Sequence, residues 1–285
     1  RANALFAKLL PLALLVGAIS CFAVLWRARE QRTLPAVIRS ALRDGEFFLN
    51  YQPIVELATG RWVGAEALIR WQRPDGSLVR PDVFVPVAED SGIILLLSRR
   101  VLELLARDAP AILALRPDFR FSVNLSQQDL TNPLTIDQLR GLLASGLKPI
   151  NLSIEATERG VMEKEAATHI LRQIRALGMR VAIDDFGTGY ANLAYLHNFE
   201  VDAIKIDKSF VDTIGTEAVT AHVALLIIEL GKTLSLDLVA EGVEHANQAE
   251  YLRDNGVRYG QGWLFARPMP AEGLRAALTA RSKGA

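Results

Sequence analysis

Apolar runs of strand-like length alternate along this chain with stretches whose apolar residues recur at helical spacing. The strand-like runs cover residues 47–54, 62–71, 119–125, 151–156, 180–183, 203–206, 236–240 and 259–265, and helical stretches such as 81–115, 163–177 and 219–234 separate most of them. Such alternation is typical of α/β proteins. Eight runs describe a closed (β/α)8 barrel better than an open sheet, although strand number alone does not distinguish the two. Residues 34–277 suit one barrel of roughly 250 residues, so we expect a single large domain.

Charged or amide side chains lie where these apolar runs end. In chain order they are Glu66, Asn124, Glu155, Asp184, Lys205, Asp207, Glu241 and Gln261. The carboxyl ends of the parallel strands of a barrel meet at one rim, and active sites of this fold are built there. Separate helix caps would not place acids, a lysine and amides so regularly over successive runs. We therefore expect these side chains to converge on one mouth.

Two adjacent carboxylates, Asp184 and Asp185, follow the apolar run 181–183 and precede a turn with two glycines, Gly187 and Gly189. Side by side the two acids repel each other, and burying either of them costs several kcal/mol unless a cation lies between them. A divalent cation is therefore one explanation. The alternative is a turn in which the acids only cap the following helix.

The composition excludes several kinds of site. Formal charges cancel, with 32 basic and 32 acidic residues, so a nucleic-acid polymer is not an expected partner. Cys21 is the only cysteine, which rules out an intrachain disulfide and a thiolate-clustered zinc site. The chemistry of this chain must come from oxygen ligands, lysine or histidine.

Residues 9–26 carry no charge and predict a transmembrane helix. As a helix this segment is about 27 Å long, against a hydrocarbon core of roughly 30 Å. Arg27, Arg29 and Arg32 follow it, and the positive-inside rule then places the remaining chain in the cytoplasm. A signal peptide cleaved near Cys21 and a buried core helix are the alternatives, but a signal peptide has its basic residues before the apolar run. The chain begins with arginine, so we expect it to be part of a longer protein.

Several motifs together resemble the EAL domain family. The segment 66–71, Glu-Ala-Leu-Ile-Arg-Trp, looks like the motif that gives the family its name. Further matching motifs are residues 51–55, 122–126, 155–158, 184–190, 204–210, 240–244 and 261–268. Their joint order and spacing cover nearly all of residues 34–277.

The resemblance implies a modified (β/α)8 barrel whose first strand runs antiparallel to the others. It also implies a phosphodiesterase that opens cyclic di-GMP to linear pGpG with two Mg²⁺ or Mn²⁺ ions. Carried over position by position, one metal would be held by Glu66, Asn124, Glu155 and Asp184. The second metal would be held by Asp184, Asp185 and Glu241. Oxygen-rich ligation of this kind is what both ions prefer.

The remaining roles are also carried over from the family. Substrate contacts would be made by Gln52, Leu68, Arg70, Asn124, Asp207 and Gln261. The catalytic set would be Glu66, Lys205, Glu241 and Glu158. Lys205 would donate to the attacking water or offset phosphoryl charge, and Glu241 would be a base or a second-metal ligand; the sequence does not separate these two roles. Glu158 resembles a glutamate that orients the loop 185–193, in which Ala191 and Asn192 replace two serines common in the family.

Two other functions stay open from the sequence. One is a receptor that binds cyclic di-GMP without cutting it, and the other is a signalling scaffold in which the membrane part carries the function. We expect residues 1–26 to end a membrane or sensor region, 27–33 to connect it to a barrel at 34–277, and 278–285 to form a tail. The arrangement resembles proteins of the bacterial inner membrane with a cysteine-containing periplasmic sensor. Family members often act as homodimers, so we expect a dimer here.

Overall fold

The computed structural model describes residues 33–158, 160, 165–188, 200–216 and 219–282. Ten strands form one sheet, and eight of them close into a barrel because β1 pairs with both β2 and β9. The barrel strands are β1 (Phe47–Glu56), β2 (Arg61–Gln72), β4 (Arg120–Leu125), β5 (Leu152–Thr157), β6 (Arg180–Phe186), β7 (Ala203–Ile206), β8 (Asp237–Ala240) and β9 (Tyr259–Gly260). The short strands β3 (Leu78–Val79) and β10 (Met269–Pro270) extend the sheet beside it. The predicted barrel is therefore confirmed.

Strand β1 runs antiparallel to both of its neighbours in the barrel, whereas the other neighbouring barrel strands are parallel. This confirms the antiparallel first strand. Pro53 lies within β1 and opposite Ala65 of β2, so it does not end the strand. On its other side β1 pairs only at residues 50–51 and 55–56. Pro53 thus lies where no second partner strand requires its missing N–H group.

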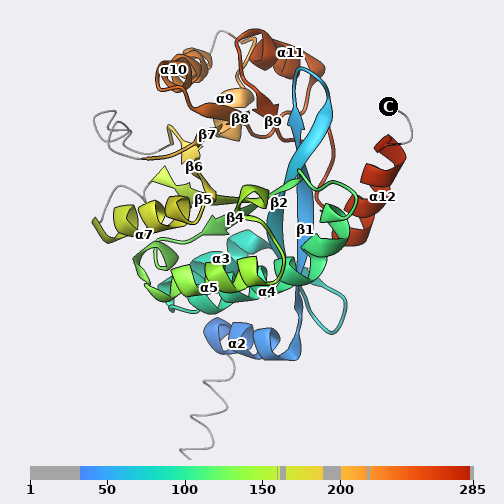
Figure 1. Ribbon diagram of the computed structural model, residues 1–285, viewed down its shortest axis with the longest axis vertical. Helices are drawn as coiled ribbons and strands as arrows, with labels where there is room; N and C mark the ends of the chain where they lie inside the picture. Colours follow the sequence, from blue (N-terminus) through green and yellow to red (C-terminus); the bar gives the residue numbers. More distant parts are fainter. Residues whose placement is uncertain (1–32, 159, 161–164, 189–199, 217–218, 283–285) are drawn as a thin grey trace, which may run out of the picture.

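Helices surround the barrel in Figure 1. They are α2 (Leu34–Asp44), α3 (Pro81–Asp90), α4 (Ile94–Leu113), α5 (Leu134–Ala144), α7 (Glu165–Ala176), α9 (Lys208–Val211), α10 (Val219–Thr233), α11 (Ala246–Asp254) and α12 (Ala271–Ser282), with 3-10 turns η1 (Asp129–Thr131) and η2 (Pro149–Asn151). Helix α4 shows why they pack: Leu97, Val101, Leu104 and Leu105 recur at helical spacing and are all buried. Helix α12 extends past residue 277, where we expected the barrel to end.

Apolar residues form a large core between the barrel and these helices, and a second cluster beneath the β1–β2 hairpin. In the second cluster Phe47, Trp71 and Phe84 pack ring against ring, with centroids 5.4 to 5.7 Å apart. Trp71 Nε1 donates to Glu46 at 2.7 Å, which satisfies the one polar group of the buried indole. Ile38 and Ala41 of α2 belong to the same cluster, so this helix attaches to the barrel through it.

Two of the expected elements differ in the structure. The helical tract expected over residues 81–115 is two helices, because the chain turns at Gly92 with a φ of +70°. The strand expected over 259–265 ends at Gly260, so Gln261 follows β9 and does not lie within it. No helix in the described part of the chain is both long and apolar enough to span a bilayer. The expected span at residues 9–26 lies outside the described residues.

Candidate active site

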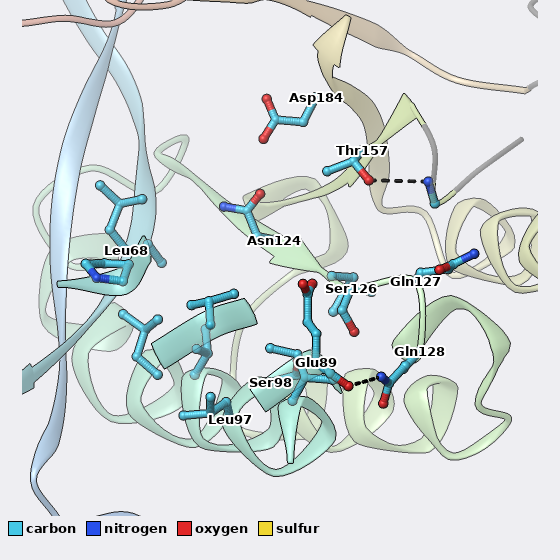
Figure 2. A pocket seen from close by; sticks show the side chains of 18 of the residues that line it. Leu68, Glu89, Leu97, Ser98, Asn124, Ser126, Gln127, Gln128, Thr157 and Asp184 are labelled. Carbon is cyan, nitrogen blue, oxygen red and sulfur yellow. Dashed lines mark hydrogen bonds between the residues drawn. The ribbon is translucent and has the colours of Figure 1, made fainter. Parts of the chain in front are cut away.

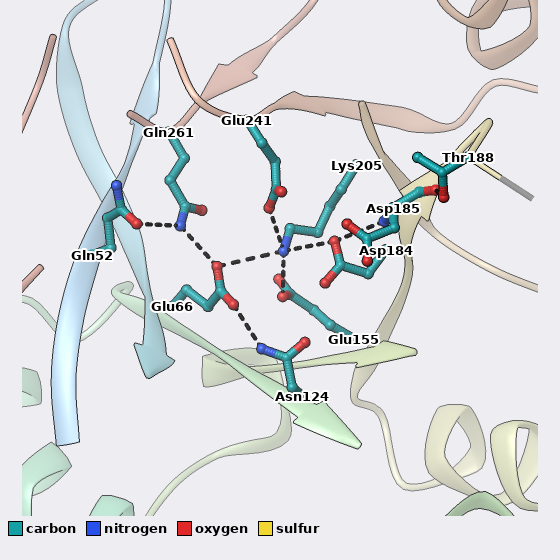
Figure 3. A network of polar contacts seen from close by, with 10 residues as sticks. All are labelled: Gln52, Glu66, Asn124, Glu155, Asp184, Asp185, Thr188, Lys205, Glu241 and Gln261. Carbon is teal, nitrogen blue, oxygen red and sulfur yellow. Dashed lines mark hydrogen bonds and ion pairs between the residues drawn. The ribbon is translucent and has the colours of Figure 1, made fainter. Parts of the chain in front are cut away.

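Polar side chains from successive strands meet at the mouth of the barrel, as Figure 3 shows. Those on strands are Gln52 of β1, Glu66 of β2, Asn124 of β4, Glu155 of β5, Asp184 and Asp185 of β6 and Lys205 of β7. Glu241 and Gln261 directly follow β8 and β9. Parallel strands in register place their carboxyl ends together, so residues far apart in sequence become neighbours.

Lys205 lies at the centre of this group and is 1% exposed. Its Nζ atom is 2.6 Å from Glu155 Oε2, 2.6 Å from Glu241 Oε1, 3.0 Å from Asp184 Oδ1 and 3.5 Å from Glu66 Oε2. Burial by itself lowers the pKa of Lys205, but the four carboxylates outweigh burial and hold it well above its ordinary value. Lys205 is therefore a cation throughout the physiological pH range.

Glu66 is held by amides on both of its oxygens. Asn124 Nδ2 donates to Oε1 at 2.6 Å, and Gln261 Nε2 donates to Oε2 at 2.8 Å and also to Gln52 at 3.1 Å. Burial by itself raises the pKa of Glu66, but the charge of Lys205 and these hydrogen bonds outweigh burial and bring the pKa below its ordinary value. Glu66 is thus ionised and fixed in orientation.

The pKa values of Glu155 and Glu241 shift in the opposite direction, because one lysine cannot offset the burial of several carboxyl groups. Burial raises the pKa of Glu155 well above its ordinary value in spite of Lys205, and the charges of Glu66 and Asp184 add to the effect. In the same way burial raises the pKa of Glu241 to about 7 against the opposing charge of Lys205. A surplus of negative charge close to Lys205 therefore favours either protons or further cations.

Two groups of these acids have the spacing of a metal site. Oxygen atoms of Glu66, Glu155 and Asp184 lie within 4.8 Å of one another, and so do oxygen atoms of Asp184, Asp185 and Glu241. Asp184 belongs to both groups, so two cations held there would be neighbours. Carboxylate donors in this number fit Mg²⁺ or Mn²⁺. Every carboxylate predicted as a metal ligand falls in one of these two groups. The predicted amide ligand, Asn124, donates a hydrogen bond to Glu66 of the first group.

The turn after β6 is supported by Glu158. Glu158 is buried, and its Oε2 accepts a hydrogen bond from the Gly187 N–H at 3.1 Å. Asp185 has a φ of +52°, an uncommon conformation for a residue with a side chain, and its N–H donates to Asp184 Oδ1 at 3.0 Å. The turn therefore directs both acids toward the mouth. Residues 189–199, with the predicted loop positions Ala191 and Asn192, lie outside the described residues.

Two cavities open on either side of the carboxylates and share Leu68 and Asp184. The larger, of about 630 Å³, extends from Arg70 and Asn124 toward α3 and α4, and Figure 2 shows Asp184 and Asn124 at one end and Gln128 at the other. The smaller, of about 340 Å³, lies between Gln52, Glu241 and Trp263. Together they offer space for an elongated ligand centred on the acids.

Most of the residues predicted to contact the substrate line these two cavities. Gln52, Leu68 and Gln261 line the smaller one, and Leu68, Arg70 and Asn124 line the larger. Asp207 is different, because its Oδ1 accepts from the Ser209 N–H at 2.9 Å and caps α9. An N-cap aspartate accepts a hydrogen bond from the second or third backbone N–H of the helix, so this oxygen of Asp207 is already used within the protein.

Several residues that line the cavities are not among the predicted site residues. They are Glu89, Ser126, Gln127, Gln128 and Thr157 in the larger cavity, and Lys208, Glu244 and Trp263 in the smaller. Glu89 and Gln128 come from helix and loop segments, where no regular strand pattern marks them. Their proximity depends on the Gln128 side chain, whose Nε2 donates to the Glu89 carbonyl at 2.6 Å. Only the packing of α3 against the β4 loop brings them to the site.

A closed barrel with carboxylates from successive strands at its mouth belongs to the class of barrels whose rim offers oxygen donors suited to a divalent metal. The chain belongs to the EAL domain family, whose model, described as "EAL domain", matches residues 36–268.

Known relatives agree with this assignment. The "Probable cyclic di-GMP phosphodiesterase PdeB" of Escherichia coli (strain K12) is 39% identical over 264 residues, which are 92% of this chain and 50% of that protein. The "Bifunctional diguanylate cyclase/cyclic di-GMP phosphodiesterase MucR" of Pseudomonas aeruginosa is 38% identical over 88% of this chain and 37% of that protein. The chain thus spans half or less of the length of these two relatives.

A solved structure, "PaMucR Phosphodiesterase, c-di-GMP complex", is similar in its fold. It superposes with a TM-score of 0.80 at 38% identity and covers 85% of this chain and 99% of that chain. The barrel seen here is therefore also the fold of a chain solved with c-di-GMP.

Proposed function

We propose that this chain hydrolyses cyclic di-GMP to linear pGpG. The observation that carries the proposal is the position of the two carboxylate groups, which share Asp184 and lie between two cavities that also share Asp184. A cyclic dinucleotide has two halves joined through phosphates, so each cavity can take one half while a phosphodiester lies over the acids. The names of the relatives support the same substrate.

The acids would hold two divalent cations, Mg²⁺ or Mn²⁺. Glu66, Glu155 and Asp184 with Asn124 would hold one, and Asp184, Asp185 and Glu241 the other. When bound, such a pair supplies a water of lowered pKa and neutralises charge on the attacking and leaving oxygens of a phosphodiester.

Other side chains of this protein balance the charge of the acids, position them and bind the phosphate. Lys205 keeps a positive charge beside the acids and limits their mutual repulsion. Gln261 and Asn124 fix the plane of the Glu66 carboxylate. Arg70 lines the larger cavity and can bind a phosphate through two N–H groups. Glu158 holds the turn that carries Asp185. We also propose Asp207 as a substrate contact. Its Oδ1 accepts the hydrogen bond that caps α9, so only its other oxygen would be available to the substrate.

Turnover of the purified chain tests the proposal. We expect release of pGpG from cyclic di-GMP with Mn²⁺ or Mg²⁺, and none with EDTA. Glu66→Gln keeps the shape of the side chain but removes the charge, and we expect it to lower kcat by more than about 100-fold, beyond the loss typical of a group that only supports a ligand. Arg140→Gln, on an exposed ion pair of α5, serves as the control and should keep full activity.

The opposite results are also informative. If the wild-type chain binds cyclic di-GMP but releases no pGpG, the chain is a receptor and the proposed hydrolysis is wrong. If it neither binds nor cuts cyclic di-GMP, a scaffold role carried by other parts of the protein replaces both.

We propose further that residues 9–26 anchor the chain in the bacterial inner membrane, with the barrel in the cytoplasm and an extracytoplasmic sensor upstream. The grounds are the uncharged segment and the arginines that follow it. Fractionation of cells that express the chain, with and without residues 1–32, tests the anchor, and equal amounts of the two in the soluble fraction would contradict it.

We also propose that the protein is a homodimer. Light scattering of the detergent-solubilised chain measures its molar mass and so tests the dimer.

A further inference from the structure

Trp263 is an exposed aromatic residue on the wall of the smaller cavity. It is 53% exposed and lines this cavity together with Gln52, Glu241 and Gln261. The other two tryptophans of the described residues, Trp62 and Trp71, are buried and belong to the core. A single exposed apolar side chain is ordinary on a protein surface, so the case for Trp263 depends on how it is held.

The loop that carries Trp263 is fixed against the chain after β8. Val243 N–H donates to Gln261 O at 3.0 Å, and Leu264 N–H donates to Val243 O at 3.0 Å. A Cβ atom on Gly262 would lie 2.1 Å from Val243 O, so only glycine allows this close approach of the two backbones. The backbone at Trp263 is therefore fixed before any ligand arrives, so binding a ligand there orders little of the main chain.

Arg267 covers part of the indole. Its Cζ atom is 4.0 Å from the centre of the Trp263 ring, the distance of a cation–π contact. The contact restrains the ring, and it places a positive charge near the cavity wall. The guanidinium of Arg267 covers one face of the indole ring, so a ligand can contact only the part of the ring that stays exposed.

Lys208 adds a donor on the same wall. Its Nζ atom is 2.9 Å from both Glu244 and Asp212, and its side chain is partly exposed. Lys208 and Glu244 both line the cavity. Lysine bound to O6 and N7 is a common contact to guanine, so a flat ring and a suitable donor border the same space.

We propose that Trp263 is a stacking platform for one guanine base of cyclic di-GMP and so determines how tightly the substrate half in the smaller cavity is bound. The proposal rests on the proposed function for the identity of the ligand. Trp263 contributes to binding and takes no part in the cleavage itself, so its loss weakens substrate binding while the metal centre stays intact.

Steady-state kinetics with two substrates tests this role. Stacking of a base on an aromatic side chain is worth about 5- to 150-fold in affinity, so we expect Trp263→Ala to raise KM for cyclic di-GMP within that range with little change in kcat. Hydrolysis of bis(p-nitrophenyl) phosphate, a phosphodiester without a purine, should stay within about twofold of wild type. Trp263→Phe keeps an aromatic face and should restore most of the affinity.

Leu264→Ala is the matched control, since Leu264 is an exposed apolar residue of the same loop and does not line the cavity. It should leave both substrates unaffected. An unchanged KM for cyclic di-GMP in Trp263→Ala, or an equal loss with both substrates, overturns the proposal.

The two proposals fail in different ways. If the wild-type chain binds cyclic di-GMP without turnover, the proposed hydrolysis is wrong, and the dissociation constant with Mn²⁺ present then gives the same comparison of Trp263→Ala with wild type. A ratio within the stated range supports stacking, and a ratio near one overturns it.

Discussion

Lys205 is the residue on which the charge balance of the site depends. One ammonium group lies within 3.5 Å of four carboxylates, three of them on different strands and the fourth, Glu241, directly after β8. Removing one partner of a buried ionic group lowers the free energy of unfolding far more than removing an exposed ion pair does. The reason is that the remaining buried charges are left without a partner and without water. The structure therefore assigns Lys205 a part in stability as well as in the proposed chemistry.

Lys205→Met is expected to lower the free energy of unfolding by about 3 to 5 kcal/mol in EDTA. Mn²⁺ should restore part of this loss, because a bound cation offsets the same carboxylates and stabilises the folded state. Urea unfolding with and without Mn²⁺ measures both effects. Lys232→Met, which removes an exposed pair with Glu229, is the control and should change stability by less than about 1 kcal/mol. Equal, small losses in the two variants would show that Lys205 is not needed to balance the acids.

Most of the site residues could be predicted because each one occupies a regular place at the end of an apolar run. Glu66, Glu155 and Asp184 were expected at one rim for this reason, and the structure brings them within 4.8 Å. The contact of Lys205 with four of the acids at once was not predictable from spacing, since it depends on how closely the barrel closes. Asp207 shows where prediction from the family is weakest. Its side chain caps α9, and this local role competes with the substrate contact carried over from the family.

At the scale of elements, the sequence predicted the strands better than the connections between them. The runs 62–71 and 203–206 match β2 and β7 closely, since strands with many buried residues leave apolar runs in the sequence. The run 259–265 was also expected to form a strand, yet β9 ends at Gly260 because Gly262 packs against Val243 and turns the chain. Turns that depend on a close tertiary contact leave little trace in local sequence.

Gly187 is such a position in the turn after β6. Its φ is +93°, and an added Cβ would lie 2.9 Å from Ile227 and 3.0 Å from Phe210. We expect Gly187→Ala to cost about 1 to 3 kcal/mol. Because the turn carries Asp185, the Mn²⁺ concentration for half-maximal activity should also rise.

A matched glycine separates this effect from a general one. Gly141 lies in α5 with no atom within 4 Å of an added Cβ, so Gly141→Ala should stabilise the protein by up to about 1 kcal/mol. Thermal unfolding and Mn²⁺ titration of both variants make the comparison. A Gly187→Ala variant that behaves like Gly141→Ala would contradict the role of this turn.

At the scale of the whole molecule, the acid surplus links folding, protons and metal. The pKa of Glu241 is raised by burial to about 7, and that of Glu155 is raised in the same direction. A carboxyl group whose pKa is higher in the folded than in the unfolded protein stabilises the fold below its unfolded pKa, and this contribution is lost as the pH rises through the folded pKa. Metal binding requires the ionised acids, so a bound cation releases the protons.

Urea unfolding at pH 6 and pH 8 tests this linkage. In EDTA the free energy of unfolding should fall over this interval, by at most about 1.4 kcal/mol per pH unit for each proton lost from the folded site. With saturating Mn²⁺ the fall should disappear, because the acids are already ionised at pH 6. Glu241→Gln removes one titrating group, so the decline in EDTA should become smaller in this variant, whereas the exposed change Glu229→Gln should leave it unaltered. The same decline with and without Mn²⁺ would mean that the acids at the barrel mouth do not bind the metal, since a cation held by Glu241 and Asp184 cannot leave their protonation unchanged.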